Sequence, residues 1–217
     1  MGGIDLTEVL IQIVVLIASL SVHEAAHAWA ADRLGDPTAR HLGRLSLNPV
    51  VHVDPIGTLL FPLIAMFTGV PLIGWAKPVP VDPRHLRHPK RDFAIIAAAG
   101  PASNIVMAVI GAVIYALLPT PAPGDIAGRV VMSAPREMFL WFTYLNVMLA
   151  VFNMIPVPPL DGGNVLIGVL PEAGARVVEQ VRPYGFIILY ALMLTGILST
   201  VLGPIPVGVT RFLLRIP

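Results

Sequence analysis

The sequence predicts an all-α, polytopic membrane protein with about four transmembrane helices and one re-entrant or β-hairpin segment embedded in the membrane. Of its 217 residues, 56% are hydrophobic and only 12% are charged, whereas soluble domains carry about 25% charged residues. Several uncharged stretches reach the length of about 20 residues that a membrane-spanning helix needs. We therefore expect a single membrane-embedded domain over residues 1–217.

The composition also excludes several kinds of partner and site. A formal net charge of +1 argues against a nucleic-acid partner. The absence of cysteine excludes disulfide bonds and leaves His, Asp and Glu as the metal ligands that are available. The first eight residues contain no Lys or Arg, so a cleaved signal peptide is not expected.

The first predicted span covers about residues 7–31. Asp5 and Thr7 suit the start of a helix, and the run Gly35-Asp36-Pro37 predicts its end. Polar and apolar residues then alternate from 41 to 49, which favours a short strand or hairpin within residues 40–55.

An uncharged segment over residues 56–75 is interrupted by glycine and proline, at Gly57, Pro62, Gly69, Pro71 and Gly74. Non-helical backbone at membrane depth must be buried in protein or line a wet cavity. We therefore predict a re-entrant segment here.

Three further spans are predicted over about residues 93–118, 138–155 and 184–202. A basic, proline-rich loop over 76–92 precedes them, and a loop rich in proline and glycine over 119–136 separates the first two. A short apolar helix is expected at about 164–170.

The basic residues predict the orientation in the membrane. Ten of the fourteen Lys and Arg lie in the segments 32–55, 76–92 and 171–183. Cytoplasmic loops carry such an excess, so these three segments are expected in the cytosol, with the N-terminus outside the cell membrane. The polar residues of the spans then gather near the cytosolic face: His23, His27, Asn104, Asn153 and Asp161.

The first span carries the pattern H-E-x-x-H as His23, Glu24 and His27. Residues i and i+4 share one face of a helix, so both imidazoles can bind one metal ion. A catalytic zinc ion has three protein ligands and one water, and Glu24 would act as the general base. The alternative is a structural His/Glu hydrogen-bond cluster, but ionisable groups inside a membrane are functional by default.

Asp161 is the candidate for the third ligand. It is the only acid between Glu137 and Glu172, and it follows the third predicted span. The alternative is a turn in which Asp161 caps the next helix.

Two asparagines near the ends of spans have alternative roles open to them. Asn104 could hold helices together or donate a hydrogen bond to substrate, and Asn153 could orient the turn that carries Asp161. The remaining histidines are interpreted as loop residues: His41, His52, His85 and His88.

Three motifs together resemble the site-2 protease family of intramembrane zinc metalloproteases. They are His23–His27, Gly100–Asn104 and Asn153–Gly163, in the family's order. The resemblance implies one zinc ion on His23, His27 and Asp161, Glu24 as general base, and Asn104 and Asn153 near the substrate. Loop 119–136 and the tail after residue 202 are too short for the PDZ or CBS domains of many members, so a minimal form is expected.

The predicted function is therefore hydrolysis of a peptide bond in a transmembrane protein substrate, within the lipid bilayer. A divalent-metal transporter is the main alternative, but it would need ligands along a whole pathway rather than in one cluster. A catalytically inactive relative that binds substrate is the third hypothesis, and it is disfavoured because all four chemical residues are present.

Overall fold

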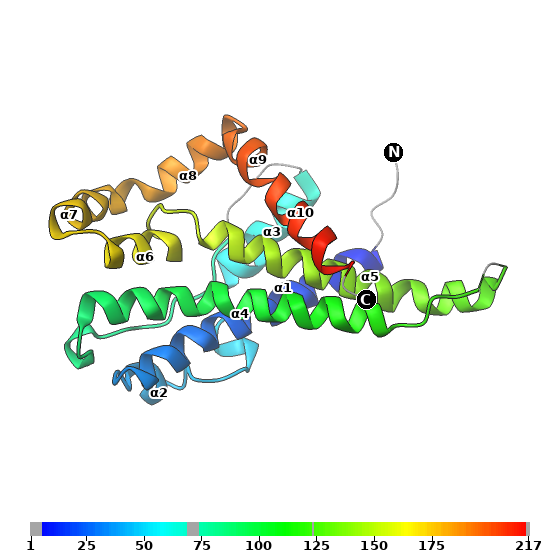
Figure 1. Ribbon diagram of the computed structural model, residues 1–217, viewed down its shortest axis with the longest axis horizontal. Helices are drawn as coiled ribbons and strands as arrows, with labels where there is room; N and C mark the ends of the chain where they lie inside the picture. The colour runs from blue at the N-terminus through cyan, green and yellow to red at the C-terminus, as the bar shows by residue number, and fades with distance from the viewer. Residues whose placement is uncertain (1–5, 69–73, 123, 216–217) are drawn as a thin grey trace.

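The computed structural model describes residues 6–68, 74–122 and 124–215, and in these residues it contains helices and no strand. Three long helices, α1, α4 and α5, run alongside one another, and the helices from α6 onward arch over them (Figure 1). The α-helices are α1 (Leu6–Arg33), α2 (Thr38–His41), α3 (Phe61–Thr68), α4 (Pro89–Leu117), α5 (Ile126–Asn153), α6 (Asp161–Val169), α7 (Glu172–Val181), α8 (Gly185–Leu194), α9 (Ile197–Leu202) and α10 (Pro204–Leu213). Short 3-10 helices are η1 (Pro49–Val51), η3 (Pro83–His85) and η4 (Arg182–Tyr184), and η2 (Pro55–Leu60) is a π-helix.

Helix α4 lies at the centre, in contact with α1, α5 and α6. Small side chains line its interfaces: Ala31 of α1 packs near Ile96 of α4, and Ala108 and Ala112 of α4 pack near Val147 of α5. Small residues let helix backbones approach closely in a membrane bundle. This close approach brings the polar residues of α1, α4 and α5 within hydrogen-bond distance of one another.

Helix α1 ends in a Schellman motif, as the run Gly35-Asp36-Pro37 predicts. Gly35 has φ of 107°, which is a left-handed conformation that favours glycine. The amide of Asp36 donates to the carbonyl of Ala31 at 2.9 Å, and that of Gly35 donates to Asp32 at 3.2 Å. These two bonds satisfy carbonyls that the end of the helix leaves open.

The buried carboxylate of Asp36 then ties the following loop to the end of α1. It accepts hydrogen bonds from the amide of Thr38 at 3.0 Å, the amide of Asp82 at 2.7 Å and His85 Nδ1 at 3.2 Å. Burial alone would raise the pKa of Asp36, but the hydrogen bonds from Thr38, Asp82 and His85 outweigh it and lower this pKa. The loop over 76–88 is thus anchored to α1.

The predicted strand or hairpin within 40–55 is wrong, because the structure has the helical turns α2 and η1 there and no strand in that range. Proline explains the difference. Pro49 and Pro55 lack the N–H that a strand ladder needs, and the preceding side chains act as helix caps: Asn48 accepts from Val50 N at 3.1 Å and Asp54 accepts from Gly57 N at 2.8 Å.

The predicted re-entrant segment over 56–75 is helical in its first part, as η2 and α3, and residues 69–73 lie outside the described residues. Its two ends lie together: the amide of Trp75 donates to the carbonyl of Gly57 at 3.2 Å, and Thr58 Oγ1 donates to the carbonyl of Trp75 at 2.8 Å. Such closure is what a re-entrant path requires. The membrane depth of the segment stays a prediction.

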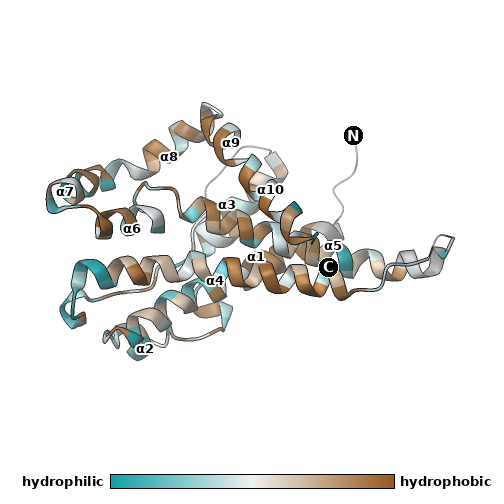
Figure 2. Cartoon of the chain, viewed as in Figure 1, coloured by the Kyte–Doolittle hydropathy of each residue, from teal (hydrophilic) through white to brown (hydrophobic). Residues whose placement is uncertain are grey.

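Three helical stretches of the described residues are long and apolar enough to span a membrane: Val9–Arg33, Pro89–Leu117 and Glu172–Leu194. The first two match the predicted spans 7–31 and 93–118. Figure 2 shows the hydrophobic residues along these helices, with hydrophilic residues gathered at the end of the bundle where α2 and the start of α4 lie.

The other two predicted spans differ from the structure. The span 138–155 overlaps α5, which starts earlier, at Ile126, ends at Asn153 and carries several polar residues along its length. The prediction of one continuous span over 184–202 is wrong, because Gly196, with φ of 74°, separates α8 from α9. The apolar stretch instead continues toward the N-terminus through η4 and α7.

Candidate metal centre

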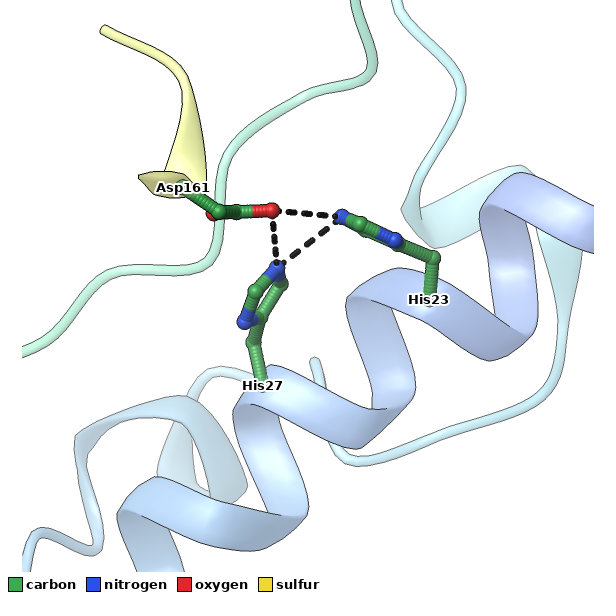
Figure 3. Close-up of side chains that lie close together, drawn as sticks. All are labelled: His23, His27 and Asp161. Carbon is green, nitrogen blue, oxygen red and sulfur yellow. Dashed lines mark hydrogen bonds and ion pairs between the residues drawn. The ribbon is translucent and has the colours of Figure 1, made fainter. Parts of the chain in front are cut away.

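Side chains from two distant parts of the chain meet at one point. His23 and His27 project from α1, and Asp161 is the first residue of α6 (Figure 3). His23 Nε2 and His27 Nε2 are 3.0 Å apart, and Asp161 Oδ2 lies 3.1 Å from the first and 3.4 Å from the second. The structure thus brings together the three residues that the sequence predicts as metal ligands.

The hydrogen bonds behind the two rings decide where their protons lie. His23 Nδ1 donates to Asn104 Oδ1 at 2.6 Å, and His27 Nδ1 donates to the carbonyl of Ile96 at 2.7 Å. A neutral imidazole that carries its proton on Nδ1 has a lone pair on Nε2. Both Nε2 atoms therefore present lone pairs toward each other and toward the carboxylate of Asp161.

This convergence of lone pairs fits a bound cation. Asp161 Oδ2 is buried and has no hydrogen-bond donor among the described residues, and an unpaired buried acceptor is costly. Zinc binds imidazole nitrogen and carboxylate oxygen at about 2.0–2.2 Å, and a tetrahedral arrangement at that distance spaces the ligand atoms about 3.3 Å apart. The three observed separations, 3.0, 3.1 and 3.4 Å, agree with this spacing.

Helix α4 makes room for the two imidazoles at Gly100. A Cβ atom placed there would lie 2.3 Å from His27 Nε2 and 2.6 Å from His23 Cε1. No side chain can be accommodated at such distances without moving the rings. The predicted motif that begins at Gly100 therefore contributes space to the centre, in addition to Asn104.

We expect Gly100→Ala to displace the imidazoles and weaken metal binding, because the added methyl group would overlap both rings. Overpacking of this kind costs about 1–3 kcal/mol, and any loss of metal affinity adds to it. Zinc content of the purified protein, measured by atomic absorption, checks this expectation. Gly208→Ala in α10 is the matched control, since a Cβ there would meet no described atom within 4 Å beyond its chain neighbours and the backbone of its own helix. Equal zinc content in both variants would contradict the steric role.

A compact turn between α5 and α6 positions Asp161. The amide of Val157 donates to the carbonyl of Ile155 at 2.8 Å, and the amide of Leu160 donates to the carbonyl of Val157 at 3.1 Å. Gly162 lies against the carbonyl of Met154, which a Cβ would approach to 2.3 Å. The turn that the sequence predicts is present, but Asp161 does not cap α6, because Leu160 is at the N-cap position and no side-chain cap hydrogen bond is formed.

Behind His23 lies a buried group of polar side chains. Asn104 of α4 accepts a hydrogen bond from His23 Nδ1 through Oδ1 and donates through Nδ2 to Asn146 Oδ1 at 2.9 Å. Asn146 of α5 and Ser19 of α1 are completely buried and were not identified from the sequence. The available signal was an asparagine in the middle of an apolar span, where a polar residue needs a partner.

Glu24 is buried beside the cluster, and its carboxylate is not one of the three grouped ligand atoms. Arg44 is a third residue whose place at the centre was not predicted from the sequence. Its guanidinium is buried and donates to the carbonyl of Lys77. Burial lowers the pKa of Arg44, and the negative charge of Glu24 partly offsets this effect. A cation thus lies within electrostatic range of the candidate general base.

The remaining predicted residues lie outside the metal cluster. Asn153 is the last residue of α5, and its Nδ2 donates to the carbonyl of Leu149 at 3.0 Å. Of the four histidines interpreted as loop residues, His52 is buried and donates through Nε2 to the carbonyl of Ser46 at 2.7 Å. The others are exposed: His41, His85 and His88.

Comparison with known proteins gives a consistent result. The model of Peptidase family M50 matches residues 11–196. A protein of Bacillus subtilis (strain 168), provisionally named zinc metalloprotease YwhC, is 37% identical over 192 residues, which cover 88% of this chain and 84% of the relative. A protein of Mycolicibacterium smegmatis, provisionally named zinc metalloprotease Rip2, is 31% identical over 84% of this chain and 66% of its own length. No solved structure gave a significant match.

Proposed function

Because this chain belongs to peptidase family M50, the site-2 protease family, we propose that it is an intramembrane zinc metalloprotease that cleaves a transmembrane protein substrate. The observation that carries the proposal is the cluster of His23, His27 and Asp161, whose ligand atoms lie within 4.8 Å of one another. The cluster lies on helices that are long and apolar enough to cross a membrane, or directly beside them.

The proposed mechanism uses four residues of this chain. A zinc ion on His23, His27 and Asp161 would supply Lewis-acid chemistry, polarising the scissile carbonyl and lowering the pKa of a water molecule. Glu24 takes the proton of the attacking water as general base and returns it to the leaving amine as general acid. The buried guanidinium of Arg44 lies within electrostatic range of the Glu24 carboxylate.

The two asparagines are assigned different roles. We propose that Asn153, at the end of α5 and before the turn that carries Asp161, contacts the substrate backbone. Both polar atoms of the Asn104 side chain are engaged, one by His23 and one by Asn146. These contacts favour a role for Asn104 in positioning His23 over the predicted contact with substrate.

The proposed location is the cell membrane, with the centre toward the cytosol. The support is the distribution of basic residues, which are concentrated in the segments predicted to be cytosolic. Water would reach the centre from that side. A single domain over residues 1–217 and one zinc ion per chain are parts of the same proposal.

Removal of the metal ion tests the proposal directly. Purified protein in detergent should cleave a model transmembrane peptide, lose all activity after treatment with a zinc chelator, and recover it when zinc is added back. The physical reason is that, without the ion, nothing would polarise the scissile carbonyl or lower the pKa of the attacking water. Full cleavage by protein shown to contain less than one-tenth of an equivalent of metal would refute the zinc mechanism.

A liposome experiment separates the protease from a divalent-metal transporter. The same preparation, reconstituted in vesicles loaded with a zinc-sensitive dye, is expected to show no zinc flux above that of empty vesicles. The reason is that the grouped metal ligands among the described residues form one cluster and not a series along a pathway. Zinc flux without peptide cleavage would favour the transporter.

A further inference from the structure

A continuous chain of hydrogen bonds connects His23 with the main chain of α5. His23 Nδ1 donates to Asn104 Oδ1 at 2.6 Å, and Asn104 Nδ2 donates to Asn146 Oδ1 at 2.9 Å. Asn146 Nδ2 in turn donates to the carbonyl of Phe142 and to Ser19 Oγ, both at 2.9 Å. The chain joins α1, α4 and α5, and the side chains of Ser19, Asn104 and Asn146 in it are completely inaccessible to solvent.

The donor-to-acceptor direction of these hydrogen bonds is determined by the carbonyl of Phe142. A main-chain carbonyl can accept but cannot donate, so the carbonyl of Phe142 requires the NH₂ group of Asn146 on its side. Asn146 must then turn its oxygen toward Asn104. Asn104 therefore presents its NH₂ group to Asn146 and its oxygen to His23.

We propose that Asn146 is a positioning residue for His23. Through Asn104 it keeps the proton of His23 on Nδ1 and leaves Nε2 available as the metal ligand. This inference rests on the proposed zinc chemistry. Neither asparagine touches the metal position. Outer partners of this kind fix the tautomer and orientation of a ligand histidine, and losing one costs about 10–100-fold in metal affinity.

The two ligand histidines are held by different means. His27 Nδ1 donates directly to the carbonyl of Ile96, a main-chain acceptor whose polarity no substitution can reverse. His23 faces an amide that could present either its oxygen or its nitrogen, and only the latter would leave the proton on the wrong ring atom. Asn146 is therefore needed for His23 alone.

Substitution of Asn146 tests the proposal through zinc affinity, measured by competition with a chromophoric chelator in detergent. Asn146→Leu removes the hydrogen bonds of this side chain both to Asn104 and to the carbonyl of Phe142. Asn146→Thr is a smaller change, because a threonine hydroxyl can donate to the carbonyl four residues earlier. Thr143 Oγ1 donates to the carbonyl of Phe139 in this way at 2.8 Å. Both variants are expected to bind zinc about 10–100-fold more weakly than the wild type. Thr143→Val, another buried polar position on α5, is the matched control and should change zinc affinity less than twofold.

A rescue experiment distinguishes positioning from a general loss of packing. In an Asn104→Asp background, both carboxylate oxygens can only accept, so the His23 proton is held on Nδ1 regardless of Asn146. Asn146→Thr should then cost less than threefold in zinc affinity. Thermal unfolding of each variant reports the fold separately.

Failure of the positioning role of Asn146 can be distinguished from failure of the proposed function. If the wild type itself binds no zinc, the proposed function fails. If the wild type binds zinc and Asn146→Thr binds it equally well, the positioning role alone is refuted. An equal loss in both backgrounds would also refute it, because it would show that Asn146 acts on the fold rather than on His23.

Discussion

Replacing Asp161 with Ala is expected to abolish zinc binding and proteolysis together. Its Oδ2 atom is the only oxygen in the cluster of described ligand atoms, and its removal leaves two imidazoles that cannot hold a catalytic zinc ion, which needs three protein ligands. Zinc affinity should fall by more than the factor of about 100 that loss of an outer partner costs. Metal analysis and cleavage of a model transmembrane peptide in the same preparation measure both effects.

Glu172→Ala is the control for this change. Glu172 is an exposed acid that pairs with Lys90 at 3.3 Å, and exposed pairs contribute little to stability. This variant should keep its full zinc content and activity. Full zinc content in Asp161→Ala, in turn, would show that Asp161 only forms the turn before α6.

Glu24→Gln is expected to lose cleavage as well, but to retain its zinc. Glutamine keeps the size of the side chain and cannot accept the proton of the attacking water, so we expect kcat to fall by about 10²–10⁴-fold, the usual contribution of a general base. The ligand cluster does not include Glu24, so zinc content should stay at the wild-type level. Peptide cleavage under single-turnover conditions measures the loss.

Glu137→Gln is the control for Glu24→Gln, because it makes the same chemical change at a different position. Glu137 is an exposed glutamate on α5, outside the cluster, and its replacement should leave kcat unchanged. Undiminished proteolysis by Glu24→Gln would refute the general-base mechanism. Loss of zinc together with loss of cleavage would show that Glu24 contributes to metal binding rather than to proton transfer.

The candidate centre was more predictable than the fold around it. His23 and His27 lie four residues apart on one helix, so a local period places both on one face. Asp161 could be found by elimination, since few acids lie at membrane depth. Asn146 could not be assigned in this way. Its role depends on which helix α5 contacts, and the local sequence pattern does not determine which helices pack together.

The errors in the fold have a related cause. Alternation of polar and apolar residues predicted a strand in 40–55, but Asn48 and Asp54 each cap a helical turn that begins at the following proline. Hydropathy placed a span over 184–202, where the left-handed Gly196 interrupts the helix. In both places a few residues with specific backbone preferences override the average hydropathy or polarity pattern of their neighbours.

The division of the ligands between α1 and α6 has a consequence for biosynthesis. His23, Glu24 and His27 leave the ribosome long before Asp161, and at about 5–20 residues per second roughly 7–30 seconds separate them. During that interval the nascent chain holds the proposed general base and two of the three candidate ligands but no complete binding site, and metal affinity arises with the folded state. The proposed active site is thus incomplete until α6 has been synthesised and has packed against α4.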